Sequence, residues 1–310
     1  MLYDLVIIGG GPAGAAAGVY AARKKLTTTL LTPDFGGQSI VSPDIHNWIG
    51  TKAISGNDLA KALENHVRAY EGADFVIQTG PAGRVTKIKQ TETGFTIERA
   101  EGENLEAKTV LLAAGSNRRK LAVPGAEQFD QKGLTYCATC DGPLFTGRDV
   151  AVIGGGNAGF ETAAQLLAYA KSVTLLHKNP DYKADQITVD KVLAHPQMSG
   201  LANVEIIEIK GDQFVTGLIY KDKNTNETKE LPVTGIFVEI GFVPNTAFAK
   251  EVVQLNEYGA IKVDPRNQQT PTLGLWAAGD CTDSLYHQNN IAAGEAVKAI
   301  EDIYNHLHLK

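Results

Sequence analysis

A glycine-rich turn that occurs twice constrains the fold of this chain more than any other feature. The apolar run 5–8 leads into GGGPAG at residues 9–14 and then into an alanine-rich stretch, and the run 150–153 leads into GGGNAG at 154–159 in the same way. A further apolar run follows each stretch, so both copies predict strand, glycine turn, helix and strand. One G-x-G-x-x-G is weak evidence, but two copies, 145 residues apart, predict two Rossmann-type dinucleotide-binding units.

Each glycine of the turn has its own physical role. The first permits a tight bend, the second has no Cβ that would block a pyrophosphate, and the third lets the helix pack closely on the strand. The helix N-terminus then directs free N–H groups and a positive dipole end toward the phosphates. These positions are Gly9, Gly11 and Gly14 in the first copy and Gly154, Gly156 and Gly159 in the second. Two such sites imply a bound flavin and a nicotinamide nucleotide as substrate.

The remaining glycine-ended strands indicate how the two units are connected. They lie at 110–115, 236–241 and 274–279, and the last precedes Asp280, which we expect to contact a ribityl hydroxyl. Their order predicts an α/β fold of two Rossmann-like domains, the second inserted into the first. Residues 1–117 and 245–310 are expected to form an FAD-binding domain, and 118–244 a nicotinamide-binding domain. Within them, 84–110 and 203–235 predict hairpins, with turns at 93–94 and 223–226.

Length and charge narrow the possible classes of protein. The 310 residues, of which 43% are hydrophobic, suit two domains of ordinary size. A net charge of -6 argues against affinity for nucleic acid or an anionic membrane surface. No apolar run approaches the roughly 20 residues of a membrane-spanning helix, and the N-terminus shows no export signal. We therefore expect a cytoplasmic protein with no membrane or nucleic-acid partner.

Two of the three cysteines, Cys137 and Cys140, form a C-x-x-C pair. Such a pair closes and reopens a disulfide at little geometric cost, and its thiolate is often stabilised, so it predicts a redox centre. Half of a zinc site is the alternative, but the positions of Cys281 and the histidines lack the spacing, and we expect no metal. Asp141 is a candidate proton donor to a leaving thiolate, or belongs simply to an Asp-Gly-Pro turn. Cys281 is expected to be a small buried residue.

The cysteine pair precedes the second glycine strand and therefore shares the inserted domain with the nicotinamide site. Both groups must reach the flavin, and they cannot readily occupy one contact together. We expect the insert to reorient, with hinges near 116–117 and 242–245.

With these motifs, the chain resembles the low-molecular-weight thioredoxin reductases over nearly its whole length. The matching stretches are GGGPAG at 9–14, GGQ at 36–38, NWIG at 47–50, CATCDG at 137–142, GGGNAG at 154–159, AAGDCTD at 277–283 and YHQ at 286–288. The resemblance implies a homodimer, bound FAD, hydride transfer from the nicotinamide to the flavin, and reduction of the disulfide by the flavin. It also implies that Cys140 faces the flavin while Cys137 attacks a thioredoxin or thioredoxin-like carrier.

The same resemblance supplies the expected binding residues. For FAD they are Gly9, Gly11, Pro12, Ala13, Gly14, Gly37, Gln38, Asn47, Gly115, Gly279, Asp280, His287 and Gln288. For NAD(P)H they are Gly154, Gly156, Asn157, Gly159, His177, Lys178 and Lys183. Thr32 departs from the pattern, because many dinucleotide folds have an acid there for the ribose.

The insert is equally similar to the reductase part of the flavoprotein component of alkyl hydroperoxide reductase, through KADQ at 183–186, GIFV at 235–238 and PNT at 244–246. That family has an additional N-terminal thioredoxin-like domain, which this sequence does not contain, so we expect a separate carrier. The alternatives are the reductase component of a peroxiredoxin or alkyl hydroperoxide system, a flavin-linked dithiol oxidase, and a non-catalytic dinucleotide-responsive protein. The second glycine turn disfavours the oxidase, and the retained cysteines disfavour the non-catalytic protein.

Residues 177–183, HKNPDYK, bear on the choice of nucleotide. NADPH-using relatives have His-Arg-Arg here with a further arginine at the position of Lys183, and NADH-using relatives have an acid at the position of His177. This chain has neither pattern. Lys178 stands where relatives place an arginine for the 2′-phosphate, and no acid stands at the strand end to repel that group. We therefore expect NADPH to be preferred over NADH by a small margin, about tenfold.

Overall fold

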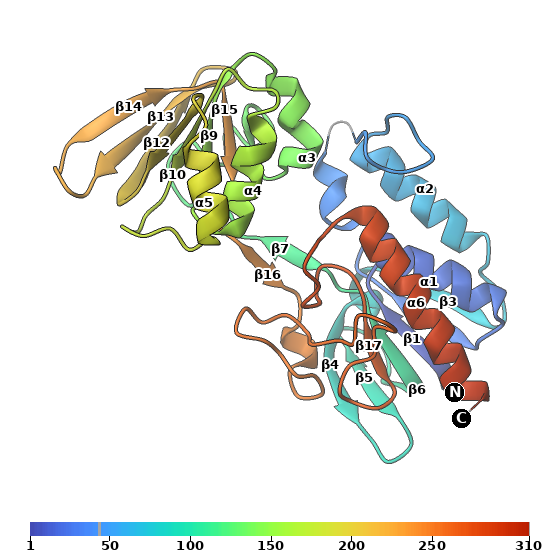
Figure 1. Ribbon diagram of the computed structural model, residues 1–310. Helices are drawn as coiled ribbons and strands as arrows, with labels where there is room; N and C mark the ends of the chain where they lie inside the picture. The colour runs from blue at the N-terminus through green and yellow to red at the C-terminus, as the bar shows by residue number, and fades with distance from the viewer. Residues whose placement is uncertain (43–44, 310) are drawn as a thin grey trace. The chain divides into compact units, whose positions relative to one another are not determined.

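The computed structural model describes residues 1–42 and 45–309, and the chain divides into two compact units (Figure 1). Unit 1 comprises Met1–Asn117 and Val243–Lys310, and unit 2 comprises Arg118–Phe242. The chain passes between them at β7 (Ser116–Arg118) and β16 (Phe242–Pro244), which pair with each other in a two-stranded sheet. No helix formed by these described residues is long and apolar enough to cross a membrane.

Unit 1 is built on a seven-stranded sheet with the order β3-β2-β1-β6-β5-β4, to which β17 adds by pairing with β6. Its strands are β1 (Leu2–Ile8), β2 (Thr28–Leu31), β3 (Phe75–Gln78), β4 (Val85–Gln90), β5 (Phe95–Arg99), β6 (Leu105–Leu112) and β17 (Leu275–Ala277). All pairs are parallel except β4–β5 and β5–β6. The segment 84–110 is thus part of the main sheet and not a separate hairpin, because β6 pairs with β5 at its start and with β1 along most of its length.

Alternate residues of β1 enter two different cores of unit 1. Leu5 and Ile7 pack with α1 (Pro12–Arg23) and α6 (Asn289–His308), which lie side by side in Figure 1. Val6 and Ile8 pack in a second cluster on the opposite face. Burial on both faces explains why this strand is apolar at every position from Leu5 to Ile8. The unit is completed by α2 (Gly56–Arg68) and the short 3-10 helices η1 (Gly37–Val41), η2 (Gly80–Gly83) and η4 (Ala247–Ala249).

Unit 2 repeats this architecture around a parallel sheet with the order β11-β10-β9-β15-β8. Its strands are β8 (Leu134–Thr135), β9 (Asp149–Ile153), β10 (Ser172–Leu176), β11 (Met198–Leu201) and β15 (Gly235–Val238). One face of β9 packs with α4 (Asn157–Leu166) and α5 (Gln186–Leu193), and the other with a separate antiparallel sheet (Figure 1). The order β11-β10-β9-β15 matches β3-β2-β1-β6 of unit 1, so the duplication extends from the glycine turns to the arrangement of these four strands.

The separate antiparallel sheet of unit 2 has three strands where the sequence predicts a two-stranded hairpin. They are β12 (Val204–Gly211), β13 (Val215–Asp222) and β14 (Thr228–Pro232). The predicted turn after residue 222 joins β13 to β14, and a further turn at 212–214 joins β12 to β13. The Asp222 carboxylate fixes the β13–β14 turn by accepting hydrogen bonds from the backbone N–H groups of Asn224 (2.8 Å) and Thr225 (3.4 Å).

Candidate functional site

The glycines of the first turn have two different roles: two of them allow the backbone to pack closely, and one leaves an open space. A Cβ on Gly9 would lie 2.1 Å from the carbonyl oxygen of Ala113, and one on Gly14 would lie 1.8 Å from that of Gly9. At Gly11, by contrast, an added Cβ would meet Gly37 Cα at 3.9 Å and no other described atom within 4 Å. Gly11 is also the N-cap of α1, whose terminal N–H groups no side chain caps. The turn therefore offers a cradle that suits a pyrophosphate.

The second glycine turn has the same division of roles. A Cβ on Gly154 would lie 2.1 Å from the Glu239 carbonyl oxygen, and one on Gly159 would lie 2.0 Å from that of Gly154. A Cβ on Gly156, the N-cap of α4, would meet nothing within 4 Å among the residues that the structure describes. The Asn157 side chain accepts a hydrogen bond from the backbone N–H of Asp185 (2.9 Å), which holds the following loop against this turn.

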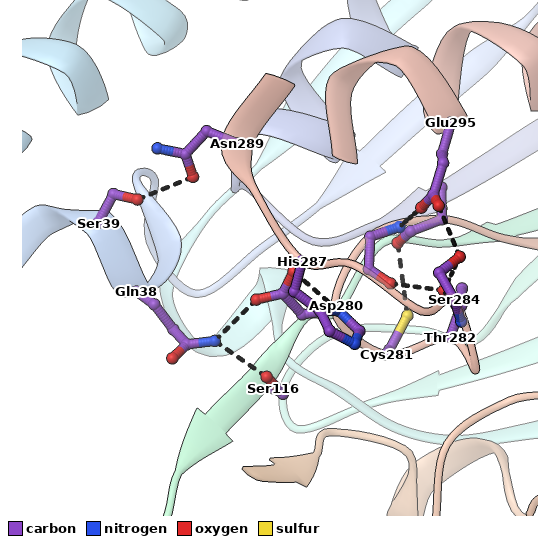
Figure 2. Close-up of polar contacts among 12 residues, drawn as sticks. Gln38, Ser39, Ser116, Asp280, Cys281, Thr282, Ser284, His287, Asn289 and Glu295 are labelled. Carbon is purple, nitrogen blue, oxygen red and sulfur yellow. Dashed lines mark hydrogen bonds and ion pairs between the residues drawn. The ribbon is translucent and has the colours of Figure 1, made fainter. Parts of the chain in front are cut away.

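Three of the expected FAD residues, drawn from different motifs, meet in a polar cluster of unit 1 (Figure 2). Gln38 Nε2 donates to Asp280 Oδ2 (3.1 Å) and to Ser116 Oγ (2.9 Å). His287 Nδ1 lies 3.5 Å from Asp280 Oδ1. Asp280 is thus held between Gln38 and His287, while Ser116 is a member that the motifs do not identify.

The other expected FAD residues also lie within unit 1. Asn47 Nδ2 donates to Gln288 Oε1 (3.1 Å), so the NWIG and YHQ stretches are in contact. Gly115 has a φ of 64° with no described atom within 4 Å of an added Cβ, whereas a Cβ on Gly279 would lie 3.4 Å from the Cβ of Ala13. Pro12 opens α1 at its first turn. Together with the open cradle at Gly11, these groups fit a flavin dinucleotide.

Glu295 is a buried acid that the motifs do not identify. Its carboxylate accepts hydrogen bonds from the Gly279 backbone N–H (2.7 Å) and from Ser284 Oγ (2.6 Å), and only 6% of the residue is exposed (Figure 2). It therefore fixes the turn that precedes Asp280. The sequence signal is its spacing, because Glu295 falls on the same helix face as the buried Ala292 and Ala299.

Thr32 occupies the position where many dinucleotide folds have an acid. It is buried, and its hydroxyl donates to the Asp34 carbonyl oxygen within the same loop. Its side chain therefore holds the loop after β2 in place.

The redox pair lies in unit 2, where Cys137 and Cys140 form a disulfide with a Cα–Cα distance of 5.4 Å. Both residues are half-buried, and they bracket the start of the short helix α3 (Ala138–Asp141), which continues into η3 (Gly142–Phe145). The backbone N–H of Cys140 donates to Cys137 Sγ (3.2 Å). The same N–H would stabilise a thiolate on Cys137 once the disulfide is reduced.

Asp141 is 6% exposed and accepts a hydrogen bond from the Thr135 hydroxyl. Burial raises the pKa of this carboxyl, while the Thr135 hydrogen bond and the charge of Arg118 oppose the rise. Asp141 therefore holds a proton more readily than an exposed aspartate, as a proton donor beside the cysteines requires.

The third cysteine is isolated from this chemistry. Cys281 is fully buried in unit 1, as the sequence predicts, and burial raises the pKa of its thiol to about 12, so it is unreactive. Within residues 1–42 and 45–309, no group of three or more His, Cys, Asp or Glu side chains is placed to hold a metal ion.

Two charged groups near the redox pair, Arg118 and Glu239, are missed by the motif analysis. Burial raises the pKa of Glu239 to about 7, while Arg118 and a hydrogen bond from Thr162 Oγ1 (3.0 Å) oppose the rise. Arg118 stacks over Phe242, with its Cζ 5.2 Å from the ring centroid, and its charge acts on both Glu239 and Asp141. The sequence does offer one indication of Glu239, because it is the single charged residue within the otherwise apolar run 236–240.

His177, Lys178 and Lys183, the expected contacts to the nucleotide's ribose, differ sharply in environment. His177 lies beneath the glycine turn, where a Cβ on Gly155 would come 2.5 Å from its ring, and it is 8% exposed. Burial, assisted by nearby lysines, lowers the pKa of His177, so the imidazole is neutral at physiological pH. Lys178 and Lys183 are exposed, and the Lys183 backbone N–H donates to the Gly155 carbonyl oxygen (2.7 Å). The two lysines, and not the histidine, supply positive charge here.

Comparison with known proteins agrees with this arrangement. A family model described as pyridine nucleotide-disulphide oxidoreductase matches residues 3–298. The chain is 41% identical over 305 residues to an NADH dehydrogenase from Bacillus subtilis (strain 168) and 42% identical over 306 residues to the F subunit of alkyl hydroperoxide reductase in Pseudomonas aeruginosa. Each match covers 98% of this chain but 58% of the relative. Among solved structures, thioredoxin reductase from Giardia duodenalis superposes with a TM-score of 0.90 at 32% identity, covering 99% of both chains.

Proposed function

Because the chain belongs to the pyridine nucleotide-disulphide oxidoreductase family, we propose that it is a flavoprotein disulfide reductase that transfers electrons from a nicotinamide nucleotide to a thioredoxin or thioredoxin-like carrier. The observation that carries the proposal is the Cys137–Cys140 disulfide beside the buried acid Asp141, in the unit that also holds the second glycine turn. We further propose that it acts as a homodimer in the cytoplasm.

The two units divide the binding tasks in this proposal. Unit 1 holds FAD, with its pyrophosphate over Gly11 and its polar groups at the Gln38–Asp280–His287 cluster. Unit 2 holds the nicotinamide nucleotide over Gly156, with NADPH preferred over NADH by a small margin because Lys178 and Lys183 favour an additional phosphate. FAD, when bound, supplies the two-electron chemistry that connects the nicotinamide to the disulfide.

The protein's own residues carry out the exchange with the carrier. The Cys137 thiolate attacks the carrier disulfide, forming a mixed disulfide and releasing one carrier thiolate. Asp141 supplies the proton that this leaving group takes up. The Cys140 thiolate then attacks Cys137 Sγ, which expels the second carrier sulfur as a thiolate and restores the Cys137–Cys140 disulfide; this thiolate takes its proton from the solvent. The carrier gains two electrons, and the dithiol of this chain loses them.

Replacement of each cysteine tests the proposal. Cys137→Ser and Cys140→Ser should each abolish thioredoxin reduction in the FAD-loaded protein, since either change removes the dithiol relay. Anaerobic titration with NADPH should still bleach the flavin absorbance in both variants, because the second glycine turn is untouched. Near-wild-type turnover with thioredoxin in either variant would overturn the assignment.

A second candidate function follows from the similarity to the F subunit of alkyl hydroperoxide reductase. In that case the electrons would reach a peroxiredoxin through a thioredoxin-like carrier. The rates at which this protein reduces thioredoxin and the carrier of a peroxiredoxin system distinguish the two, because a general thioredoxin reductase should prefer thioredoxin and a peroxide-system reductase should prefer the other carrier.

A further inference from the structure

A third lysine, Lys223, reaches the loop that follows β10. It lies in the turn between β13 and β14, and its Nζ donates to the backbone carbonyl oxygen of Lys178 (2.9 Å). Its backbone N–H donates to the carbonyl oxygen of Asn203 (3.0 Å), whose own N–H donates to that of Asn179 (2.9 Å). The turn of the antiparallel sheet is therefore joined to the loop that carries Lys178 and Lys183.

The loop after β10 carries one acid, Asp181, between Lys178 and Lys183. The positive charges of Lys178, Lys183 and Lys223 all contribute to lowering the pKa of His177, so all three lie within electrostatic range of its ring. No ion pair involving any of them occurs among residues 1–42 and 45–309. The nearest acid on the turn is Asp222, whose carboxylate is engaged with backbone N–H groups of its own turn. Since Asp185 also accepts hydrogen bonds from backbone N–H groups, at the start of α5, the three lysines outnumber the one remaining acid, Asp181, at this end of the β10 strand.

His177 gives an independent indication that a ligand binds here. Only 8% of the residue is exposed, and its Nε2 has no hydrogen-bond partner among the described residues. An unpartnered buried polar atom is unusual in a folded protein and calls for an explanation such as a bound group. The ring lies directly beneath Gly155, next to the open cradle at Gly156.

We infer that Lys223 is a specificity-determining residue that, together with Lys178 and Lys183, binds the phosphate on the adenosine ribose of NADPH. In dinucleotide folds the residues after the second strand contact this part of the ribose, and cations there accommodate a 2′-phosphate. Lysines act on a phosphate as point charges, so several are needed to replace one arginine fork. The inference rests on the proposed function in one respect, that unit 2 binds a nicotinamide nucleotide.

Calorimetric titration of the oxidised, FAD-loaded protein tests this inference. Lys223→Gln should weaken NADP⁺ binding about tenfold, while the Kd for NAD⁺ changes less than about twofold. Lys221→Gln is the matched control, because Lys221 lies two residues earlier on β13 and is not among the lysines that act on His177. It should leave both constants unchanged. Lys223→Arg should keep the preference for NADP⁺, and 2′,5′-ADP should show the same loss as NADP⁺ in Lys223→Gln.

Three results would overturn the inference: equal weakening of NADP⁺ and NAD⁺ in Lys223→Gln, no change in either, or tighter binding of NAD⁺ than of NADP⁺ by the wild type. Equal weakening would show that Lys223 only supports the loop. The titration involves neither the cysteines nor a carrier. A protein that binds NADP⁺ as expected but does not reduce thioredoxin would therefore overturn the proposed function and leave the role of Lys223 intact.

Discussion

Glu239 places a carboxyl group at the end of a strand whose preceding residues, Phe237 and Val238, are buried. Its Oε1 accepts a hydrogen bond from Thr162 Oγ1 (3.0 Å), and burial raises its pKa to about 7. The folded chain therefore keeps this acid protonated at pH values where the unfolded chain carries a carboxylate. Glutamine has nearly the same shape as glutamate but cannot ionise, so it is a suitable replacement for Glu239.

We predict that Glu239→Gln changes how stability depends on pH. Because the folded pKa lies above the unfolded value of 4.5, Glu239 contributes stability that is complete below about pH 4.5 and is lost as the pH rises through about 7. Glutamine does not ionise, so the variant does not lose stability in this way. Between about pH 4.5 and pH 7 the free energy of unfolding of the variant, relative to that of the wild type, should therefore rise by roughly 2 kcal/mol. Urea denaturation of both proteins at several pH values measures the difference.

Glu205→Gln, an exposed position on β12, serves as the control and should show no such pH-dependent gain. A difference between Glu239→Gln and wild type that stays constant with pH would mean that Glu239 is already ionised in the folded protein.

The strand–turn–helix elements contain glycines whose replacement should have opposite consequences. Gly156 has a φ of -96°, which alanine adopts freely, and an added Cβ would meet no described atom. Gly159 has no such freedom, since its Cβ would lie 2.0 Å from the Gly154 carbonyl oxygen. The space beside Gly156 is open among the described residues, and the space beside Gly159 is filled by the chain itself.

We predict that Gly156→Ala folds with wild-type stability but loses nicotinamide nucleotide binding by at least about tenfold, because the methyl group enters the pyrophosphate cradle. Gly159→Ala should instead lower the free energy of unfolding by roughly 2 to 4 kcal/mol. Thermal denaturation and calorimetric titration separate the two effects. Gly11→Ala provides the control, since it should affect FAD retention and spare the nicotinamide site; a loss of FAD in Gly156→Ala would contradict this division.

Elements that bury both faces are well predicted from the sequence. The runs of β-branched and aliphatic residues at 28–31 and 173–176 correspond to β2 and β10 within one residue, because such side chains favour strands. The antiparallel pairings are predicted less well. The pairing of β5 with β6 in unit 1 and of β13 with β14 in unit 2 joins strands across a turn, and the alternation within one strand does not specify its partner.

The candidate site shows the same limit. Gln38, Asp280 and His287 follow from family motifs, and the structure brings them together. Glu295 and Lys223 belong to no motif, and each acts through a backbone group, 16 and 45 residues away respectively. Interactions of a side chain with a distant backbone atom leave almost no trace in residue type, so only the folded chain reveals them.

At the level of the whole molecule, unit 2 is one continuous stretch with its own cores on both faces of its sheet. We predict that residues 118–242 expressed alone fold cooperatively, form the Cys137–Cys140 disulfide and bind a nicotinamide nucleotide without FAD. Circular dichroism melting, thiol titration and calorimetry check the three properties. An excised unit that is unfolded under native conditions would show that its stability depends on unit 1.

Unit 1, unlike unit 2, is assembled from two separate stretches, and this affects the order of events during synthesis. β17 completes the sheet beside β6, and α6 packs against α1, yet both are translated after all of unit 2. Residues 1–117 therefore cannot complete their fold until the inserted unit has been synthesised, and the surface of α1 that α6 covers stays exposed during that time. Folding of the insert brings the paired strands β7 and β16 together, which removes most of the loop-closure entropy that would oppose the late docking of β17 and α6. Because Asp280 follows β17, the flavin pocket that we propose around it forms only after unit 2 has been translated, and a ribosome-bound chain halted before β17 should not retain the cofactor.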